Sequence, residues 1–520
     1  MRDTCAIEDS AFFKVPKINS FAGLPADFYT RLPTTPLKAP KLVHANPGAG
    51  RSVGLSSEQL LTQKFLDVVS GTAPLPGGDT LAAVYSGHQF GVWAGQLGDG
   101  RAHLLGEIAG ERGSWELQLK GAGPTPYSRR GDGRAVLRSS IREYLGSQAM
   151  AGLGIPTTHA LALVSAQDYV MRETLETAAV VARMAPSFIR FGSFEHWAAR
   201  NAPQNLTALA DYVIEHFYPE CLIPESGLAD TPDQRYVRLL REVVRRTAKL
   251  MAQWQLVGFC HGVMNTDNMS ILGLTLDYGP YGFMDAFDAK HICNHTDAQG
   301  RYAWHAQPAV AHWNLYQLAN SLHVIVPDAE ALRGALDTFE PTFLEAMQTK
   351  LSLKLGLGAW QHGDEVLIDD LWSLMQENHA DFTLTFRQLA HAPGLGHADP
   401  VRVSQDLGGT VSRDIAAFID LFIDRAAASA WLERYRQRVQ AEGAIEKGAR
   451  IDSMLSVNPL YVLRNYLAQS AIEAAQNGDF SEIGSLFEVL TDPFTYQPGR
   501  DAYAAQPPAW ATKIEVSCSS

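Results

Sequence analysis

The residues whose types and spacing could do chemistry lie together in residues 261–285, which read HGVMNTDNMSILGLTLDYGPYGFMD. A polar loop ends at Asn268, an apolar run follows over 269–276, and Asp277 comes directly after that run. Amide and carboxylate oxygens are ligands that Mg²⁺ and Mn²⁺ prefer. The stretch therefore predicts a divalent metal site built from Asn268 and Asp277.

Protein kinases arrange their metal ligands in this way, with an Asn from the catalytic loop and the Asp of a D-F-G triplet. The kinase loop reads H-R-D-x-x-x-x-N, so counting back from Asn268 places the usual catalytic Asp at Val263. An ordinary phosphoryl transfer would lack its usual base here.

A glycine-rich segment earlier in the chain could bind phosphate. Five glycines fall within residues 87–100, ahead of a strand predicted over 102–108. Backbone amides in such a turn can approach a phosphate closely, although a tight hairpin also needs glycine. The spacing of Gly95, Gly98 and Gly100 gives G-x-x-G-x-G, not the kinase pattern G-x-G-x-x-G, and Arg101 follows.

A second predicted strand, 115–120, ends on Lys120, and a helix predicted over 135–150 carries Glu143. In kinases a strand lysine pairs with a helix glutamate and is thereby aimed at phosphate oxygens. Glu143 could instead pair on its own helix, with Arg138 or Arg142.

Two arginines follow in or near the next strands, which are predicted over 159–164 and 178–184. Arg183 lies within the second strand and Arg190 shortly after it. A buried arginine needs a partner, and both a nucleotide phosphate and a structural salt bridge would supply one.

The remaining pattern is mostly helical. A long amphipathic helix over 236–254 leads into the 261–285 loop, whereas residues 1–55 hold no period and are expected to wrap over the first domain. Further helices are predicted over 309–325, 329–352, 365–378, 412–441 and 459–475.

The order of these parts is that of a two-lobed kinase: glycine turn, strand lysine, helix glutamate, long helix, polar loop, strand, Asp-x-Gly. We therefore expect an α+β, protein-kinase-like (pseudokinase) fold. Residues 1–185 would form an N-terminal extension and a β-rich N-lobe, and residues 186–520 a mostly helical C-lobe with extensions.

Composition bounds the class of protein. The chain has 520 residues, 46% of them hydrophobic, which is ample for sizeable cores. Its net charge of −13 argues against nucleic-acid or anionic-membrane partners. Five scattered cysteines, no recognisable targeting segment and no apolar run long enough to span a bilayer indicate a cytoplasmic protein. The sequence does not set the oligomeric state, for which a monomer is the simplest expectation.

The chain resembles the selenoprotein O family, the pseudokinase-fold protein adenylyltransferases. The motifs that carry the resemblance are YSGHQFGVWAGQLGDGRA (85–102), ELQLKGAGPTPYSRRGDGRAVLRSSIREYL (116–145), residues 261–285, NPLYVLRNYLAQ (458–469) and the terminal Ser-Cys-Ser-Ser. The resemblance implies that ATP binds flipped relative to kinases, so that its α-phosphate faces the acceptor. AMP would then be transferred to Ser, Thr or Tyr hydroxyls of proteins, with Mg or Mn.

The resemblance also implies residue roles. The nucleotide would be bound by Gly98, Gly100, Arg101, Lys120, Asp132, Gly133, Arg183, Arg190 and Asp277. Asn268 and Asp277 would hold the metal, Asp267 would accept the proton of the attacking hydroxyl, and Glu143 would pair with Lys120.

The cysteines raise one further hypothesis. Cys518 stands where some family members carry selenocysteine, and we expect it to pair with Cys293 as a redox-sensitive disulfide. His291, Cys293 and His295 could suggest zinc, but their spacing is poor for such a site.

Three other functions stay open. No feature of the sequence indicates which nucleobase is bound, so UMP transfer with Mn is one alternative. A phosphotransferase with Asp267 as its base is the second. An inactive nucleotide-binding scaffold is the third, although Lys120, Glu143, Asn268 and Asp277 together exceed what a scaffold needs.

Overall fold

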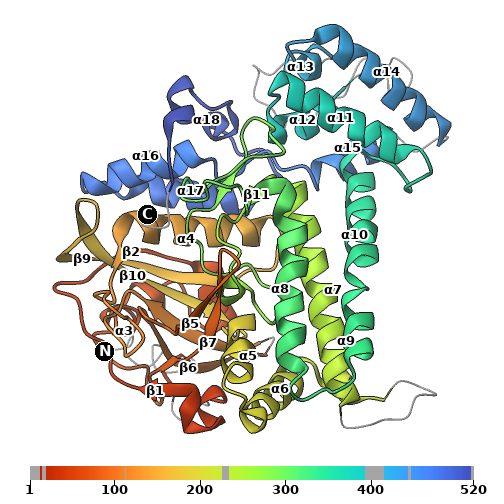
Figure 1. The fold of residues 1–520 in the computed structure, drawn as a ribbon. Coiled ribbons are helices and arrows are strands. Elements are labelled where there is room, and N and C mark those ends of the chain that lie inside the picture. Colours follow the sequence, from red (N-terminus) through yellow and green to blue (C-terminus); the bar gives the residue numbers. More distant parts are fainter. Residues whose placement is uncertain are drawn as a thin grey trace.

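An antiparallel sheet occupies the N-terminal part of the chain, and helices dominate after it (Figure 1). The computed structural model describes residues 12–14, 19–111, 113–224, 233–392, 415–442 and 447–516. The strand order in the sheet is β1-β3-β6-β7-β10-β9-β2, and β8 pairs with β10. These strands are β1 (Tyr29–Arg31), β2 (Lys41–Ala45), β3 (Leu81–Ala83), β6 (Ala102–Gly110), β7 (Gly113–Lys120), β8 (Ala135–Val136), β9 (His159–Met171) and β10 (Leu175–Ala185).

The four strands predicted from the sequence are confirmed as β6, β7, β9 and β10, with β9 extending beyond its predicted end. The expectation for residues 1–55 is wrong in part, because β1 and β2 pair with β3 and β9 near the two edges of the sheet. A short helix, α2 (Pro47–Ser52), follows them. Strands of three and five residues are too short to show a period, so only the sheet itself reveals them.

Both faces of the sheet are covered. The helix predicted over 135–150 is confirmed as α4 (Leu137–Gly152), whose Ile141 and Leu145 pack with Leu163 and Val181 of the sheet in the largest core cluster. A second cluster on the other face includes α3 (Gln63–Val69). Because α4 packs along β9 and β10, the residues that it carries are held rigidly against this part of the sheet.

The long helix predicted over 236–254 is confirmed as α7 (Gln234–Leu256), with its apolar stripe buried. It packs against α8 (Gln307–Leu322), α9 (Ala329–Leu336) and α10 (Phe339–Lys354) (Figure 1). The prediction of one helix over 329–352 is wrong, since α9 and α10 are separate. Pro341 lies in the first turn of α10, where its ring would clash with the carbonyl four residues back in a continuous helix.

Two shorter helices, α5 (Phe191–Ala198) and α6 (Pro203–Phe217), lie between the sheet and α7 in the chain. A separate apolar cluster joins α11 (Asp364–Asn378), α12 (Phe382–Leu389), α13 (Ile415–Ile419), α14 (Arg425–Ala441) and α15 (Lys447–Leu455). The predicted helix 412–441 is in fact α13 and α14, and its first three residues lie outside the described part. The helix predicted from 459 begins later, as α16 (Asn465–Gln476), and α17 (Ser481–Thr491), which packs on α4, was not predicted.

Across the described residues, no helix has both the length and the apolar character needed to cross a bilayer.

Candidate active site

An open cavity of about 500 Å³ lies between the sheet and the 261–285 loop. Its volume is typical of small-molecule sites. The predicted site residues that line it are Gly98, Gly100, Arg101, Lys120, Arg183, Arg190, Asp267, Asn268 and Asp277. They come from segments up to 179 positions apart in the chain.

Three cations converge on one carboxylate in this cavity. Arg183 Nη1 donates to Asp277 Oδ1 at 2.7 Å, and Arg190 Nη1 donates to Asp277 Oδ2 at 2.6 Å. Lys120 Nζ lies 3.9 Å from Asp277 Oδ1. Burial alone would raise the pKa of Asp277, but Arg190, Arg183 and Lys120 outweigh it and hold this pKa well below its usual range.

The strand register explains why the cations meet. Arg183 on β10 is directly opposite Gln118 on β7, and Lys120 ends β7 two residues later, so the three side chains share one face of the sheet. Lys120 Nζ donates to Glu143 Oε2 at 2.5 Å, and Arg183 Nη1 donates to Glu143 Oε1 at 2.9 Å. Glu143 thus joins two cations of the sheet to α4.

The alternative partners of Glu143 are engaged elsewhere. Arg138 binds the carboxylate of Glu176, and Arg142 donates to the carbonyl oxygen of Tyr281. Glu143 itself does not line the cavity, so it acts on the cavity only through Lys120 and Arg183.

The loop that carries Asp277 is irregular. The prediction of a strand over 269–276 is wrong, because this run makes only two isolated bridges, at Ser270 and Thr275. Gly273 adopts a left-handed φ of 69° and Asp277 one of 57°, and both break an extended run. A left-handed non-glycine residue is uncommon and often lies at a functional site, where the surrounding contacts hold it in place.

Asp267 lies on the cavity wall with one oxygen unused. Its Oδ2 accepts from Gln89 Nε2 at 3.1 Å, whereas its buried Oδ1 has no hydrogen-bond partner among the described residues. Burial raises the pKa of Asp267 to about 6, against the opposing effects of Gln89 and Arg190. A carboxylate with a free oxygen and this pKa is suited to accept a proton near neutral pH.

Asn268, the next residue, has a fixed orientation. Its Nδ2 donates to the carbonyl oxygen of Val263 at 2.9 Å, which leaves its Oδ1 as the acceptor. Val263, at the position of the usual kinase Asp, lines the cavity but offers no side-chain chemistry.

Two predicted nucleotide-binding residues lie outside the cavity lining. The carboxylate of Asp132 is bound by Arg172 at 2.7 and 2.8 Å, and it is largely exposed. Gly133 has φ 70°, and a Cβ there would lie 2.2 Å from Gly123. In this structure Gly133 therefore serves a close backbone approach within its loop.

Sequence reasoning missed other residues of the cavity wall. Arg129 lines it from the loop between β7 and α4, and it lies in the basic run 129–130 that the sequence displays. Gln89 and Phe90 line it from the hairpin β4 (Ser86–Gln89) and β5 (Val92–Gln96). No local signal places that hairpin beside a loop 178 residues further along the chain.

Cys293 is buried and donates a hydrogen bond from its Sγ to the carbonyl oxygen of Cys260 at 3.2 Å. Its expected partner, Cys518, lies outside the described residues. Val516, the last described residue, accepts at its carbonyl oxygen from the backbone N of His295, so the tail reaches the segment of Cys293. The described residues contain no group of three or more His, Cys, Asp or Glu side chains that could hold a metal.

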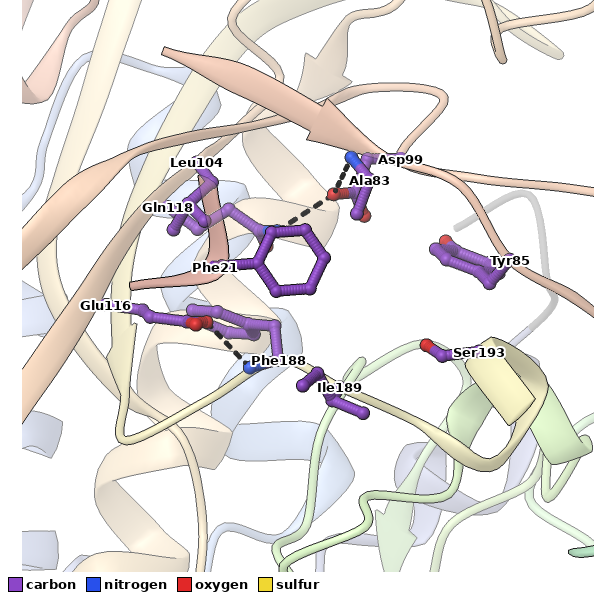
Figure 2. A pocket seen from close by; sticks show the side chains of 10 residues that line it. All are labelled: Phe21, Ala83, Tyr85, Asp99, Leu104, Glu116, Gln118, Phe188, Ile189 and Ser193. Carbon is purple, nitrogen blue, oxygen red and sulfur yellow. Dashed lines mark hydrogen bonds between the residues drawn. The ribbon is translucent and has the colours of Figure 1, made fainter. Parts of the chain in front are cut away.

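A small cavity of about 20 Å³, whose lining is drawn in Figure 2, shares Tyr85 and Asp99 with the large one. Gln118 Nε2 donates to Asp99 Oδ2 at 3.3 Å, and Gln118 Oε1 accepts from Arg183 at 2.6 and 2.9 Å. Asp99 stands between Gly98 and Gly100. Gln118 therefore connects the glycine-rich segment to the arginine that binds Asp277.

Glu116, beside this small cavity, is expected to make stability depend on pH. Burial raises the pKa of Glu116 to about 8, although the backbone N of Phe188 donates to its Oε2 at 2.8 Å (Figure 2). Between the unfolded pKa near 4.5 and the folded value, the folded state binds more protons. Stability contributed by this group therefore falls as pH rises, by up to about 1.4 kcal/mol per pH unit.

Glu116→Gln should remove the pH-dependent stability that Glu116 contributes. Thermal unfolding at pH 5.5 and 7.5 should show a smaller loss of stability for Glu116→Gln than for the unmodified protein. Glu111→Gln, exposed in the turn between β6 and β7, should behave like the unmodified protein. Equal pH dependence in all three proteins would show that Glu116 is ionised in the folded state.

The cavity holds three cations paired with carboxylates and lies beside a glycine-rich segment. This combination is typical of enzymes that bind a nucleotide and transfer a phosphoryl or nucleotidyl group from it. Comparison with known proteins agrees with that class. The model of a family described as protein adenylyltransferase SelO matches residues 12–491. The chain belongs to the SelO family, and it is an enzyme of the nucleotidyltransferase class.

Its relatives cover nearly the whole chain. A protein named protein nucleotidyltransferase YdiU from Bordetella petrii is 63% identical over 503 residues, which are 96% of this chain and 98% of the relative. Proteins of the same name from Dechloromonas aromatica and Ralstonia nicotianae are 51% and 52% identical, again over 96% of this chain, and over 97% and 95% of their own lengths.

Proposed function

We propose that this protein transfers AMP from ATP to Ser, Thr or Tyr hydroxyls of other proteins. The observation that carries the proposal is that Asp267, whose buried Oδ1 has no hydrogen-bond partner among the described residues, lines the same cavity as the three cations gathered at Asp277. Asp267 is suited to accept a proton from a hydroxyl, and the three cations are suited to bind the negative charge of a triphosphate.

The proposal includes a kinase-like division of the chain. Residues 1–185 form the N-lobe with its extension, and residues 186–520 form the helical C-lobe with further extensions. The sheet with α4 on one side of the cavity, and the 261–285 loop after α7 on the other, support this division.

A divalent metal fits the donors present. Asn268 Oδ1 and the carboxylate of Asp277 are hard oxygen ligands, and the low pKa of Asp277 keeps it ionised. Both oxygens of Asp277 also accept from arginines, so a metal would share this carboxylate with them. Mg or Mn bound there would neutralise phosphate charge during transfer.

The protein's own groups supply the remaining chemistry. Asp267 accepts the proton of the acceptor hydroxyl, whose oxygen forms a bond to the α-phosphorus. The bond from that phosphorus to the oxygen bridging the β-phosphate breaks, and pyrophosphate leaves. Lys120, Arg183 and Arg190 bind the phosphate oxygens and hold the α-phosphorus in line with the attacking oxygen.

We also propose, as the resemblance to the family implies, that ATP binds flipped relative to kinases, and the absence of the usual base is consistent with this. The usual kinase position holds Val263, so the attacking group must lie where Asp267 can reach it. Gly98, Gly100 and Arg101 would contact the phosphates from the sheet side. Asp132 and Gly133 would contribute to nucleotide binding only after the loop between β7 and α4 moves, since Asp132 is bound to Arg172.

UMP transfer with Mn is the second candidate. The relatives carry the name nucleotidyltransferase, which specifies no base. Phosphate transfer by the same Asp267 is a third outcome, and an inactive scaffold a fourth.

The product distinguishes these candidates. The protein is incubated with ATP or UTP, each with Mg or Mn, and with a cell extract, and modified peptides are identified by mass spectrometry. The proposal expects AMP on Ser, Thr or Tyr. UMP found in preference to AMP, or phosphate alone, would replace the proposed reaction with the corresponding alternative, and bound but unconsumed nucleotide would indicate a scaffold.

We further propose that Cys293 and Cys518 form a disulfide that alters activity. The approach of Val516 to His295 supports this pairing, whereas the contact of Cys293 with Cys260 makes a Cys260–Cys293 disulfide the competing one. Peptide mapping after oxidation should find the 293–518 link, and activity in Cys518→Ser should not respond to redox conditions. A 260–293 link, or an unchanged response in Cys518→Ser, would contradict the pairing.

A further inference from the structure

The hairpin β4–β5 stands apart from the main sheet. Its strands pair only with each other among the described residues. They are joined by Phe90 and Gly91, whose φ values of 51° and 80° are those of a two-residue turn with left-handed backbone at both positions. Such turns form tight hairpins that match the strand twist.

This hairpin is fastened to the loop that carries the proposed base. The backbone N of His88 donates to Thr266 Oγ1 at 2.7 Å, and Phe90 N donates to Asn265 Oδ1 at 3.0 Å. With the bond from Gln89 to Asp267, three successive residues of the hairpin are bonded to three successive residues of the loop. The position of the hairpin is therefore fixed relative to the proposed base.

The other edge of the hairpin is exposed and apolar. Val92 is 70% exposed, Trp93 41% and Phe90 39%. Gln89 and Val92 flank the turn and form the hydrogen-bonded pair, so Trp93, opposite His88, directs its backbone N–H and C=O away from β4. Proteins usually cover or charge such an edge, because it pairs readily with another strand.

A cation lies at the end of this edge. The guanidinium of Arg301 packs over the ring of Trp313 at 4.9 Å and against Gly91, where an added Cβ would lie 2.9 Å from Arg301 Cζ. Arg301 is partly exposed, and its Nε is buried without a hydrogen-bond partner in the described part of the chain, so a bound segment would meet the terminal nitrogens of its guanidinium. An acidic side chain on a bound segment would complement it.

We propose that β5 is the docking strand for the acceptor protein, a proposal that rests on the proposed function. An extended segment of the acceptor adds alongside β5 through backbone hydrogen bonds, with its apolar side chains against Val92 and Trp93. An acidic residue of the segment contacts Arg301. Since the hairpin is bonded to Asp267, a segment held on β5 places its Ser, Thr or Tyr hydroxyl near that carboxylate.

Lysine substitutions on β5 test the docking. A charge on an edge strand opposes strand addition, so Val92→Lys and Trp93→Lys should weaken binding of the acceptor. The probe is dephosphorylated casein, an unfolded acidic protein rich in Ser. Its binding is measured by fluorescence anisotropy, and AMP transfer to it is measured as KM and kcat. Leu61→Lys, at a residue 77% exposed and outside the hairpin, is the matched control.

Both β5 variants should bind casein about tenfold more weakly and raise KM for casein by a similar factor, while kcat and the affinity for ATP stay within twofold. Unchanged casein binding would overturn the docking proposal. If the unmodified protein transfers no AMP yet binds casein through β5, the proposed function fails and the docking surface stands. If β5 instead mediates self-association, sedimentation will show that the unmodified protein is a dimer and that both β5 variants are monomers, while casein binding is the same in all three. That result would show that the assignment of β5 to the acceptor is wrong.

Discussion

Asp267→Asn is expected to lower the rate of nucleotidyl transfer by about 10²- to 10⁴-fold, the usual contribution of a positioned base. The substitution removes the proton acceptor but keeps an oxygen that can accept from Gln89. Because burial of the carboxylate already disfavours its charged form, the neutral amide should not destabilise the fold at pH 7.5. Transfer rates, ATP affinity and thermal unfolding of the purified variant check each part.

Asp99→Asn is the matched control for Asp267→Asn. It alters another carboxylate of the cavity wall, which accepts from Ala83 N and Gln118. Its effect on the rate should be much smaller than that of Asp267→Asn. An Asp267→Asn protein that transfers at the unmodified rate would show that another group, or none, accepts the proton.

Asp277→Asn should lower transfer by about 10³-fold or more, since a bound metal contributes several kcal/mol to such a reaction. It should also abolish Mn²⁺ binding, measured by electron paramagnetic resonance. Removing this carboxylate leaves Arg183 and Arg190 without their shared partner, and breaking a buried ion pair costs about 3–5 kcal/mol. The amide retains one acceptor oxygen and should limit that loss, which chemical unfolding will measure.

Glu143→Gln separates the loss of metal binding from the loss of stability. Glu143 binds two of the same cations, Lys120 and Arg183, but does not line the cavity. It should destabilise the protein to a similar extent while Mn²⁺ binding persists. Loss of Mn²⁺ binding in Glu143→Gln but not in Asp277→Asn would mean that the metal ligands are wrongly assigned.

Local pattern predicted much of the framework. The strand-like runs of β6, β7, β9 and β10 and the stripe of α7 each lie within one element, so the sequence alone reveals them. Errors arose where a competing local effect ended an element. Gly273 interrupts the apolar run after Asn268, and Pro341 separates α9 from α10.

The site was predictable where residues resemble known parts in order, and not where distant segments meet. Lys120 and Asp277 were singled out because each lies in a recognisable motif, and Arg183 because an arginine within a predicted strand needs a partner. Gln118 looked like an ordinary strand residue, and only the register of β7 with β10 shows that it binds Arg183. The glycine-rich segment was compatible with the β4–β5 hairpin, but its contacts with the loop were not predictable, because they are with residues more than 170 positions away.

The most direct test of AMP transfer uses two samples of ATP, one labelled at the α-phosphate and one at the γ-phosphate. Each is incubated with the protein and a cell extract, with the Asp277→Ala variant as control. The account predicts that α label alone appears on protein, and that the variant transfers none. γ label on protein without α label would contradict the account and make the enzyme a phosphotransferase with Asp267 as its base.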